Sequence, residues 1–431
     1  MNIKSKNRIV IAIRRPRKSA ALAATLAVLL VFARAASAQQ VIMPAPVYPV
    51  TPPAVQESEV NNEMNVFGAE ASAPANAQET QPFQYGIFTL RPHPFYRVLY
   101  GNGILSNTNQ AENTVIHQIS PGFLLDIGRH WTLDYTPTWT LYSNSHFQNT
   151  LDHVVTLTGG SSYEDWTFGL SQGFTMTSDP LAETATQTSE QTYTTAINAS
   201  YQINSKMTTD LGLGQSIISA DQFNSSREWS TLDWLNYEFW PRLNGGIGAG
   251  FGYVNMQVGP DMTYEQLQSR IEWRATDKIS FQVNGGGEER QFLSGVGGDL
   301  LNFVFGAAIQ YQPFEVTKIS ISADRTLSPS YFGGATENTD FTCGLNQRLL
   351  GKLFLDLQGG YHVVKYVASA NTASPINNRQ DDLYSVSVQL SYPFAQRGSV
   401  SAFYQASSDS SSQPGFGYSS SQVGFQISYS Y

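Results

Sequence analysis

The last ten residues of the chain alternate strictly between apolar and polar side chains. The apolar set is Val423, Phe425, Ile427, Tyr429 and Tyr431, and the polar set is Gln422, Gly424, Gln426, Ser428 and Ser430. Because successive side chains of a strand point to opposite faces, this pattern predicts a sheet with one apolar and one polar face. The same alternation recurs over 131–141, 193–203, 353–363 and 384–392. It indicates an all-β chain.

Strand length and connection length separate the possible β folds. The alternating segments run roughly 10 to 14 residues, whereas the strands of a soluble sandwich average about 5 to 6 and bilayer-spanning strands need about 9 to 11. Short connections are expected at 128–131, 163–166, 204–207, 240–243, 276–279, 313–318, 349–352 and 393–398. Long ones are expected at 102–113, 143–150, 177–189, 219–226, 257–262, 293–298, 328–336, 368–378 and 406–418.

Eight short and nine long connections predict eighteen strands. Sixteen is the rival count, because the first strand, near His93–Gly101, has the weakest pattern. An even strand number, with short turns at one rim and long loops at the other, is typical of transmembrane barrels. In hydrocarbon every backbone N–H and C=O must be paired within the protein, and a closed sheet leaves no edge. The sequence therefore predicts a transmembrane antiparallel up-and-down β-barrel whose C-terminal strand ends in an aromatic residue.

Composition fits this prediction and excludes other classes. Charged residues make up 14% of the chain, against about 25% in ordinary soluble domains, and aromatic residues make up 12%. That aromatic content excludes disorder throughout, and the single cysteine excludes a disulfide framework. Cys343, between Phe341 and Leu345, is expected on the lipid-facing side as a small apolar side chain. Aromatic residues expected at the two membrane interfaces are Trp131, Trp166, Trp229, Trp240, Tyr311, Tyr392 and Tyr431.

With these features the chain resembles bacterial outer-membrane β-barrels, in particular the porin-like families, over about residues 93–431. The most specific element is the terminal segment 422–431, which is similar to the assembly signal of these barrels, although many of them end in Phe and this chain ends in Tyr431. The resemblance implies a bacterial outer-membrane location, contact with lipid and lipopolysaccharide, and recognition by the barrel-assembly machinery through the C-terminal strand. Trimers are common among diffusion porins, so a homo-oligomer is a further expectation.

The N-terminus predicts secretion. Seven basic residues precede an apolar stretch over 20–33, and Ala36-Ser37-Ala38 follows, which indicates a signal peptide over 1–38. A membrane anchor is the alternative, but about 14 apolar residues are short for a span. Residues 39–84 are rich in Pro and Ala and are expected to be a disordered periplasmic lead-in, or alternatively a segment folded into the lumen. The barrel is assigned to 85–431. After cleavage, 17 basic and 34 acidic residues give a net charge of −17, which excludes nucleic-acid binding.

Charged residues project from the predicted inner face in one part of the barrel. The candidate channel-lining residues are Arg270, Glu272, Arg274, Glu288, Arg290, Asp324, Arg348, Asp356 and His362. They form either a mixed-charge constriction that selects solutes or cross-strand ion pairs that stiffen the wall. Gly246, Gly248, Gly250 and Gly252 also share this face, and they mark a sheet bend, room for neighbouring side chains, or bare backbone lining the interior.

Sixteen to eighteen strands leave an aqueous lumen, and no loop is long enough for a plug domain. The predicted function is an open or loop-constricted channel for diffusion of small polar solutes. The alternatives are a barrel component of a secretion or exopolysaccharide-export system, a structural surface barrel, and a barrel enzyme. No catalytic residue is assigned, because no nucleophile or zinc motif is present; His146 and His153, near Asp152, and the outward His117 are interpreted as loop or interface residues.

No cofactor or tightly bound metal is expected. Acidic residues of the expected external loops could bind Ca²⁺ or Mg²⁺ loosely beside anionic lipopolysaccharide, or be ordinary solvated side chains. These residues are Glu112, Asp179, Glu183, Asp221, Asp261, Glu337, Asp381, Asp382 and Asp409.

Overall fold

The computed structural model describes residues 83–102, 112–178, 180–181, 186–221, 223–293, 299–367, 379–394 and 397–430. Within these ranges no helix is long and apolar enough to cross a membrane. The strands of the first half are β1 (Phe83–Tyr85), β2 (Phe88–Asn102), β3 (Asn113–Ile127), β4 (Trp131–Tyr142), β5 (Thr150–Tyr163), β6 (Trp166–Thr177), β7 (Pro180–Leu181), β8 (Thr186–Gln187), β9 (Glu190–Gln202), β10 (Met207–Ala220) and β11 (Ser226–Trp240). Those of the second half are β12 (Leu243–Met256), β13 (Met262–Thr276), β14 (Ile279–Phe292), β15 (Leu300–Phe314), β16 (Thr317–Pro329), β17 (Ala335–Leu349), β18 (Leu353–Val367), β19 (Gln380–Phe394), β20 (Gly398–Ser411) and β21 (Tyr418–Tyr429).

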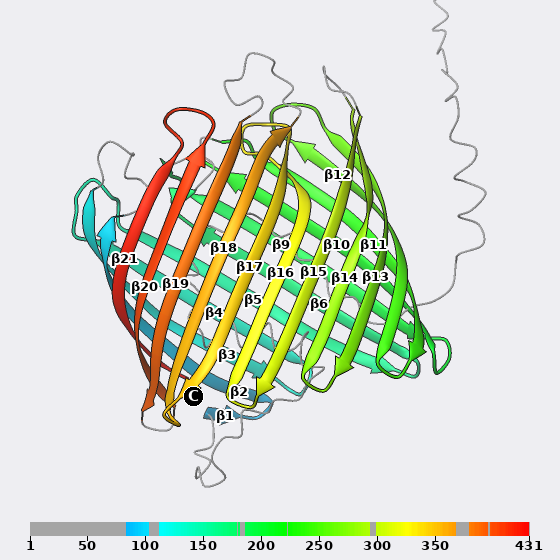
Figure 1. Cartoon of the computed structure of the whole chain (residues 1–431), viewed down its shortest axis with the longest axis horizontal. Coiled ribbons are helices and arrows are strands. Elements are labelled where there is room, and N and C mark those ends of the chain that lie inside the picture. Colours follow the sequence, from blue (N-terminus) through cyan, green and yellow to red (C-terminus); the bar gives the residue numbers. More distant parts are fainter. Residues whose placement is uncertain are drawn as a thin grey trace, which may run out of the picture.

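Eighteen of these strands form a closed antiparallel barrel (Figure 1). Each strand pairs with its neighbours in chain order, and the ring closes where β2 pairs with β21, from Phe95 opposite Ser428 to Gly101 opposite Gln422. The predicted strand number is confirmed and the rival count of sixteen is wrong. Closure removes the free edge that would otherwise leave unpaired backbone groups in hydrocarbon, each costing several kcal/mol.

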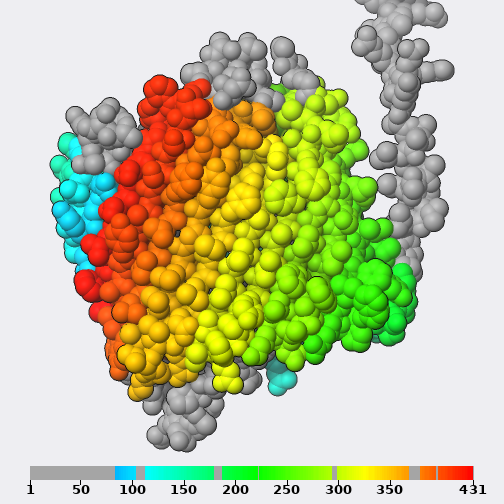
Figure 2. Space-filling view, in the orientation of Figure 1, coloured from blue at the N-terminus to red at the C-terminus, as the bar shows by residue number. Residues whose placement is uncertain are grey.

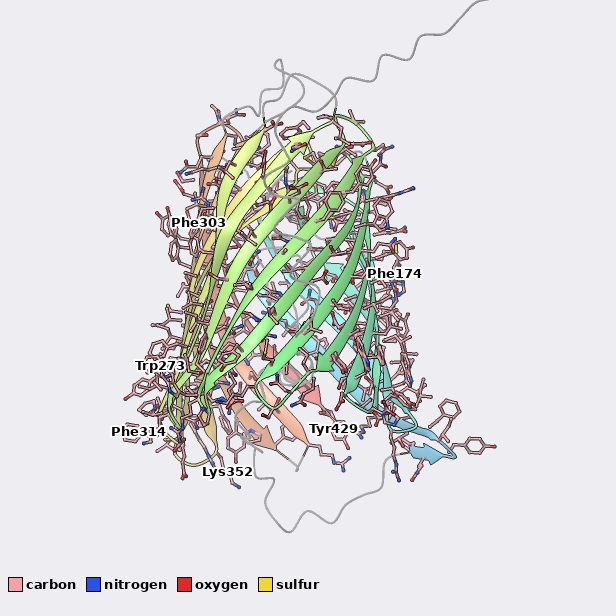
Figure 3. The ribbon with its side chains drawn as sticks, turned by 90° about the vertical axis from the view of Figure 1, so that its right-hand side faces the viewer. Phe174, Trp273, Phe303, Phe314, Lys352 and Tyr429 are labelled. Atoms are coloured by element: carbon pink, nitrogen blue, oxygen red, sulfur yellow. The ribbon has the colours of Figure 1, made fainter. Side chains whose placement is uncertain are left out.

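The polar and apolar faces also lie as the alternation predicts. In β21, Gln422 and Gln426 are each 3% exposed, whereas Val423 and Phe425 are 51% and 61% exposed. The polar face therefore lines the interior and the apolar face covers the exterior of the wall. Figure 3 shows the labelled Phe174, Trp273, Phe303 and Phe314 projecting outward from the strands, and Figure 2 shows the outer surface of β15–β20 as a continuous wall.

The first strand differs from its prediction. It begins at Phe88 rather than near His93, and β1 pairs with it through Phe83 opposite Leu90. Phe83 and Gln84 therefore belong to a hairpin rather than to the lead-in expected over 39–84. The hairpin turns at Gly86, whose φ of +61° suits a residue without a Cβ. The alternation is weak here because the Pro and His residues of 91–94 interrupt it.

The strand ends that the eight short connections join lie at one end of the barrel, and the strand ends that the nine longer connections join lie at the other (Figure 1). We call these the short-turn end and the long-loop end. The connection between β6 and β9 carries the additional β7–β8 pair. Outside the described residues lie the predicted signal peptide, the lead-in up to residue 82, Tyr431, Asp179 and Glu183.

The aromatic residues named as interface candidates lie near strand ends. Trp131, Trp166, Trp240, Tyr311 and Tyr392 lie toward the short-turn end. Trp229 lies near the long-loop end, where its ring stacks on Tyr253 with a centroid distance of 6.0 Å. These positions fit two belts of aromatic side chains, one at each membrane–water interface. Their location at the membrane interfaces stays a prediction.

The exposed Cys343 allows a test of which face meets lipid. We expect an environment-sensitive maleimide probe on Cys343 to report an apolar environment in liposomes, because the outer face contacts hydrocarbon. Thr342, whose Oγ1 contacts Ser322 Oγ at 2.6 Å, points to the other side of the same strand. The matched variant, Thr342→Cys in a Cys343→Ser background, should report water. Equal emission spectra from the two positions would contradict the assigned faces.

Candidate functional site

The interior of the barrel holds most of its buried polar side chains. The inner wall buries uncharged polar residues, such as Ser401, Gln422 and Ser428. It also buries charged residues, such as Asp210, Glu288 and Arg290. Burying a charge without a partner is costly, so the position of each charged group depends on what it contacts. The candidate site is therefore this lumen, and its chemistry is set by the ion pairs and hydrogen bonds across neighbouring strands.

Arg270, on β13, is held by groups from two other strands, β10 and β11. Its Nη2 lies 2.8 Å from Asp210 Oδ2, and its Nε donates to Asn236 Oδ1 at 3.0 Å. The guanidinium also lies 4.4 Å from the centre of the Trp234 ring, in cation–π geometry. Asp210 further accepts hydrogen bonds from Ser200 Oγ at 3.2 Å and from Asn236 Nδ2 at 3.1 Å. The predicted inward position of Arg270 thus corresponds to a buried ion pair with Asp210.

A second charged group lies nearer the long-loop end. Arg290 Nε donates to Glu288 Oε1 at 2.9 Å, and its guanidinium lies 4.8 Å from the centre of the Tyr264 ring. The Tyr264 hydroxyl donates to Glu228 Oε1 at 2.5 Å. Tyr264 and Arg270 are six residues apart on β13, about 20 Å along the strand. The five residues from Arg270 to Arg290 therefore do not form one constriction ring, because strand geometry separates them by height.

The glycine row of β12 provides room for the two aromatic rings. A Cβ on Gly248 would lie 2.7 Å from atoms of the Trp234 ring, and one on Gly252 would lie 2.1 Å from Tyr264 Cζ. Each ring occupies the space of the missing side chain and lies against a guanidinium. Of the alternatives for these glycines, room for neighbouring side chains is the one that the structure supports.

Of the remaining candidates, His362 and Asp324 lie on either side of Asp340, while Asp356 and Arg348 lie elsewhere. His362 Nδ1 contacts Asp340 Oδ1, and Asp324 is opposite Asp340 in the β16–β17 register. Asp356 Oδ1 accepts from Asn346 Nδ2 at 3.0 Å. At the short-turn end, Arg348 Nε donates to the Gly351 carbonyl at 2.6 Å.

Glu272 and Arg274 share the inner face of β13 with Arg270 but are exposed. They lie toward the short-turn end, beyond the Asp210–Arg270 pair. Neither belongs to the buried charged groups around Arg270 and Arg290.

The loop between β16 and β17, residues 330–334, crosses the long-loop mouth of the lumen. The Tyr331 hydroxyl donates to Glu190 Oε2 at the start of β9, and the Tyr331 carbonyl accepts from Asn224 N at 3.0 Å. The Phe332 ring packs edge-on against Phe223 at 5.7 Å and Phe416 at 6.3 Å. Six strands, β10–β15, separate β16 from β9 around the wall.

Those seven strand spacings amount to roughly 33 Å along the wall. Five extended residues span at most about 17 Å. The loop is therefore too short to follow the rim to β9. Because Phe332 contacts both Phe223 of the β10–β11 connection and Phe416 of the β20–β21 connection, the loop lies over the interior. It places a tyrosine and a phenylalanine in the mouth, which narrows the lumen at that end.

Several lumen residues were missed by the sequence analysis. Asp210 lies on the inner face because Leu211 and Leu213 face outward, so the alternation alone could have placed it. Its pairing with Arg270, three strands away, could not be predicted from the sequence, because the two residues are 60 positions apart and meet only through the register of the strands between them. The inward course of 330–334 has no local sequence signal beyond its Gly333-Gly334 pair.

His117, His146 and His153, the histidines considered as candidate catalytic residues, contact different groups. His146 Nδ1 lies 2.6 Å from Glu112 Oε2, while His153 Nδ1 contacts the Tyr135 hydroxyl at 3.0 Å on the outer face. The hydrogen bond from His146 lowers the pKa of the partly exposed Glu112 carboxyl below its ordinary value. His117 also faces outward, where its Nδ1 contacts the Tyr96 hydroxyl at 2.9 Å.

Several acidic candidates of the long-loop end are bound to protein groups. Asp261 Oδ2 accepts from Tyr253 Oη at 2.9 Å, and Glu337 Oε2 lies 2.5 Å from Arg325 Nη2. Asp381 pairs with Arg379. Within the described ranges, no group of three or more His, Cys, Asp or Glu side chains is placed to hold a metal ion.

No protein-family model and no curated protein matches the chain. Among solved structures, it is similar to the outer-membrane protein opdK from Pseudomonas aeruginosa, with 12% identity, 79% of this chain and 98% of that chain covered, and a TM-score of 0.44. It is similar to OccK2 (OpdF) of the same organism, with 11% identity, 80% and 98% covered, and a TM-score of 0.45. The siderophore receptor PirA, also from Pseudomonas aeruginosa, matches at 9% identity, 79% and 80% covered, with a TM-score of 0.42. Similarity this low assigns no function to this chain.

The glycine row yields a stability prediction. We expect Gly252→Ala to destabilise the barrel by about 1–3 kcal/mol, because the new methyl would displace the Tyr264 ring and overpack the wall. Gly287→Ala is the matched control, since nothing lies within 4 Å of a Cβ built there. Thermal unfolding of both variants in detergent measures the difference. Equal unfolding temperatures for the two variants would contradict the assigned role of Gly252.

Proposed function

We propose that the protein is a channel of the bacterial outer membrane through which small polar solutes diffuse, narrowed at its long-loop end by residues 330–334. The single observation that carries this proposal is the closed ring of eighteen strands with an apolar outer face and a polar inner face. A barrel of this strand number encloses more volume than its own wall side chains fill, so water and solutes have a path.

Charge arrangement gives the channel its expected selectivity. Arg270 with Asp210, and Arg290 with Glu288, place opposite charges beside each other on the inner wall. Such pairs fix the side chains and orient water more than they create a net field. These two pairs are therefore expected to contribute little to discrimination between small cations and anions.

The setting of the channel is also part of the proposal. The signal peptide over 1–38 would direct export, and the alternating strand that leads to Tyr431 would be recognised by the barrel-assembly machinery. Lipid would cover the outer face, and lipopolysaccharide would surround the long-loop end. Carboxylates there that have no protein partner could bind Ca²⁺ or Mg²⁺ loosely. Assembly as a homo-oligomer completes the proposal. No catalytic role is proposed.

Conductance of the purified protein in planar bilayers tests the function. We expect ohmic single-channel currents, and we expect Phe332→Ala to raise the conductance, because it removes the ring that packs between Phe223 and Phe416 in the mouth. Phe303→Ala is the control, since Phe303 is 60% exposed on the outer face. A properly folded barrel without ion current would refute the channel and favour a structural barrel or an export component.

Ion selectivity tests the contribution of the Asp210–Arg270 pair. We expect Arg270→Gln to shift the reversal potential in a salt gradient toward cations, because Asp210 then carries an unbalanced charge. Asp210→Asn should shift it the opposite way, and the double variant should return it close to the wild-type value. Reversal potentials that stay the same in both single variants would show that this pair does not face the path of the ions.

A further inference from the structure

Arg97, on the inner face of β2, differs from the other deeply buried arginines. Among the residues that the structure describes, Arg97, Arg290 and Arg379 are the arginines with an exposure of 5% or less. Arg290 pairs with Glu288, and Arg379 pairs with Asp381. Arg97 has no carboxylate within ion-pair distance in the described part of the chain.

Neutral groups surround the Arg97 guanidinium. Its Nη2 donates to Gln405 Oε1 at 3.0 Å, and its Cζ lies 3.9 Å from the centre of the Phe403 ring. Gln405 is fixed in turn, because its Nε2 donates to Gln422 Oε1 at 2.5 Å. Phe403 can approach because a Cβ on Gly424 would lie 2.6 Å from its Cζ. The wall thus holds the guanidinium in one place without neutralising it.

Unpaired polar atoms lie on both sides of Arg97. Gln118 of β3 and Gln426 of β21 are its direct neighbours in the register, and they are 5% and 3% exposed. Arg97 Nε, Gln426 Nε2 and Gln118 Oε1 are buried without a hydrogen-bond partner. Arg97 Nε and Gln426 Nε2 are donors, and Gln118 Oε1 is an acceptor. Even if Gln118 Oε1 accepts a hydrogen bond from one of these two donors, the second donor and the positive charge of Arg97 have no partner.

An unmatched buried charge is expensive unless a ligand of opposite charge completes it. A guanidinium with amide groups beside it offers the planar array of N–H donors that suits a carboxylate. We propose that Arg97, Gln118 and Gln426 form a binding site for a carboxylate group in the lumen. This inference rests on the proposed channel function, because it identifies small solutes that carry a carboxylate as the class of solute that the channel favours.

The carboxylate could come from a solute or from the chain itself. Residues 39–82 contain five glutamates, Glu57, Glu59, Glu63, Glu70 and Glu79, and no lysine or arginine. Both sources present the same chemistry to Arg97. The test therefore needs one arm for each source.

Thermal unfolding of the full-length protein in detergent measures binding without any ion current. Sodium acetate is titrated against sodium chloride at constant ionic strength, with acetamide as the neutral analogue, because a ligand that binds the folded state raises the unfolding temperature. We expect acetate, and not acetamide, to stabilise the protein, and Arg97→Gln to weaken the apparent acetate affinity at least about tenfold. Arg91→Gln is the matched control: it removes a charge from the same face of β2, where Arg91 pairs with Asp126 at 2.7 Å.

A variant with all five glutamates of 39–82 changed to Gln distinguishes the two sources. Acetate binding in the wild-type chain that depends on Arg97 supports a solute site. Binding that emerges only in the five-glutamine variant, and is lost on adding Arg97→Gln, supports a site filled by the chain's own carboxylates. Absence of Arg97-dependent acetate binding in both backgrounds overturns the proposal.

Two further measurements separate the possible failures. If Arg97→Gln does not assemble, Arg97→Lys retains the charge but not the fork of donors, and acetate affinity should fall at least about threefold; an unchanged affinity counts against the site. Bilayer currents test the channel independently. Acetate binding without ion current would refute the proposed channel but support the carboxylate site. Ion current without acetate binding would support the channel and refute the carboxylate site.

Discussion

The need to pair every backbone N–H and C=O inside a hydrocarbon layer is the constraint on which this structure depends. An isolated sheet with the alternation of this chain would expose two unpaired edges, and each unpaired group in lipid costs several kcal/mol. The β2–β21 pairing, from Phe95 opposite Ser428 to Gly101 opposite Gln422, removes both edges together. Because the ring is closed, the polar face of every strand is enclosed, and the lumen follows from that closure.

Enclosure then determines how charged side chains behave. Arg270 and Arg290 each have a carboxylate partner and an aromatic ring, and the rings fit because β12 offers glycine opposite them. Arg97 has the ring and the amides but no carboxylate. The charges of Arg270 and Arg290 are thus paired on the wall over β10–β14, whereas Arg97 on β2 has no carboxylate beside it in the described part of the chain.

Much of this fold could be predicted from residues 113–429, because a two-residue period is a local property that survives without knowledge of partners. The strand number, the two faces and the outward Cys343 follow from it. The prediction failed where the pattern is interrupted: Pro92 and Pro94 obscured the start of β2, and Phe83 was assigned to the lead-in although it pairs with Leu90. The two-residue period places Arg270 and Arg290 on the inner face, but it does not show that they pair with different carboxylates about 20 Å apart along the strands.

By itself the sequence determined that the chain forms long amphipathic strands and which side chains of each strand face inward, because side-chain direction in a strand depends only on position parity. The tertiary structure alone decided which inward groups meet. Asp210 reaches Arg270, and Tyr331 reaches Glu190 across the mouth, through registers and ring closure that join residues 60 and 141 positions apart. Such pairings depend on the accumulated alignment of many strands, and no local pattern in the chain encodes that alignment.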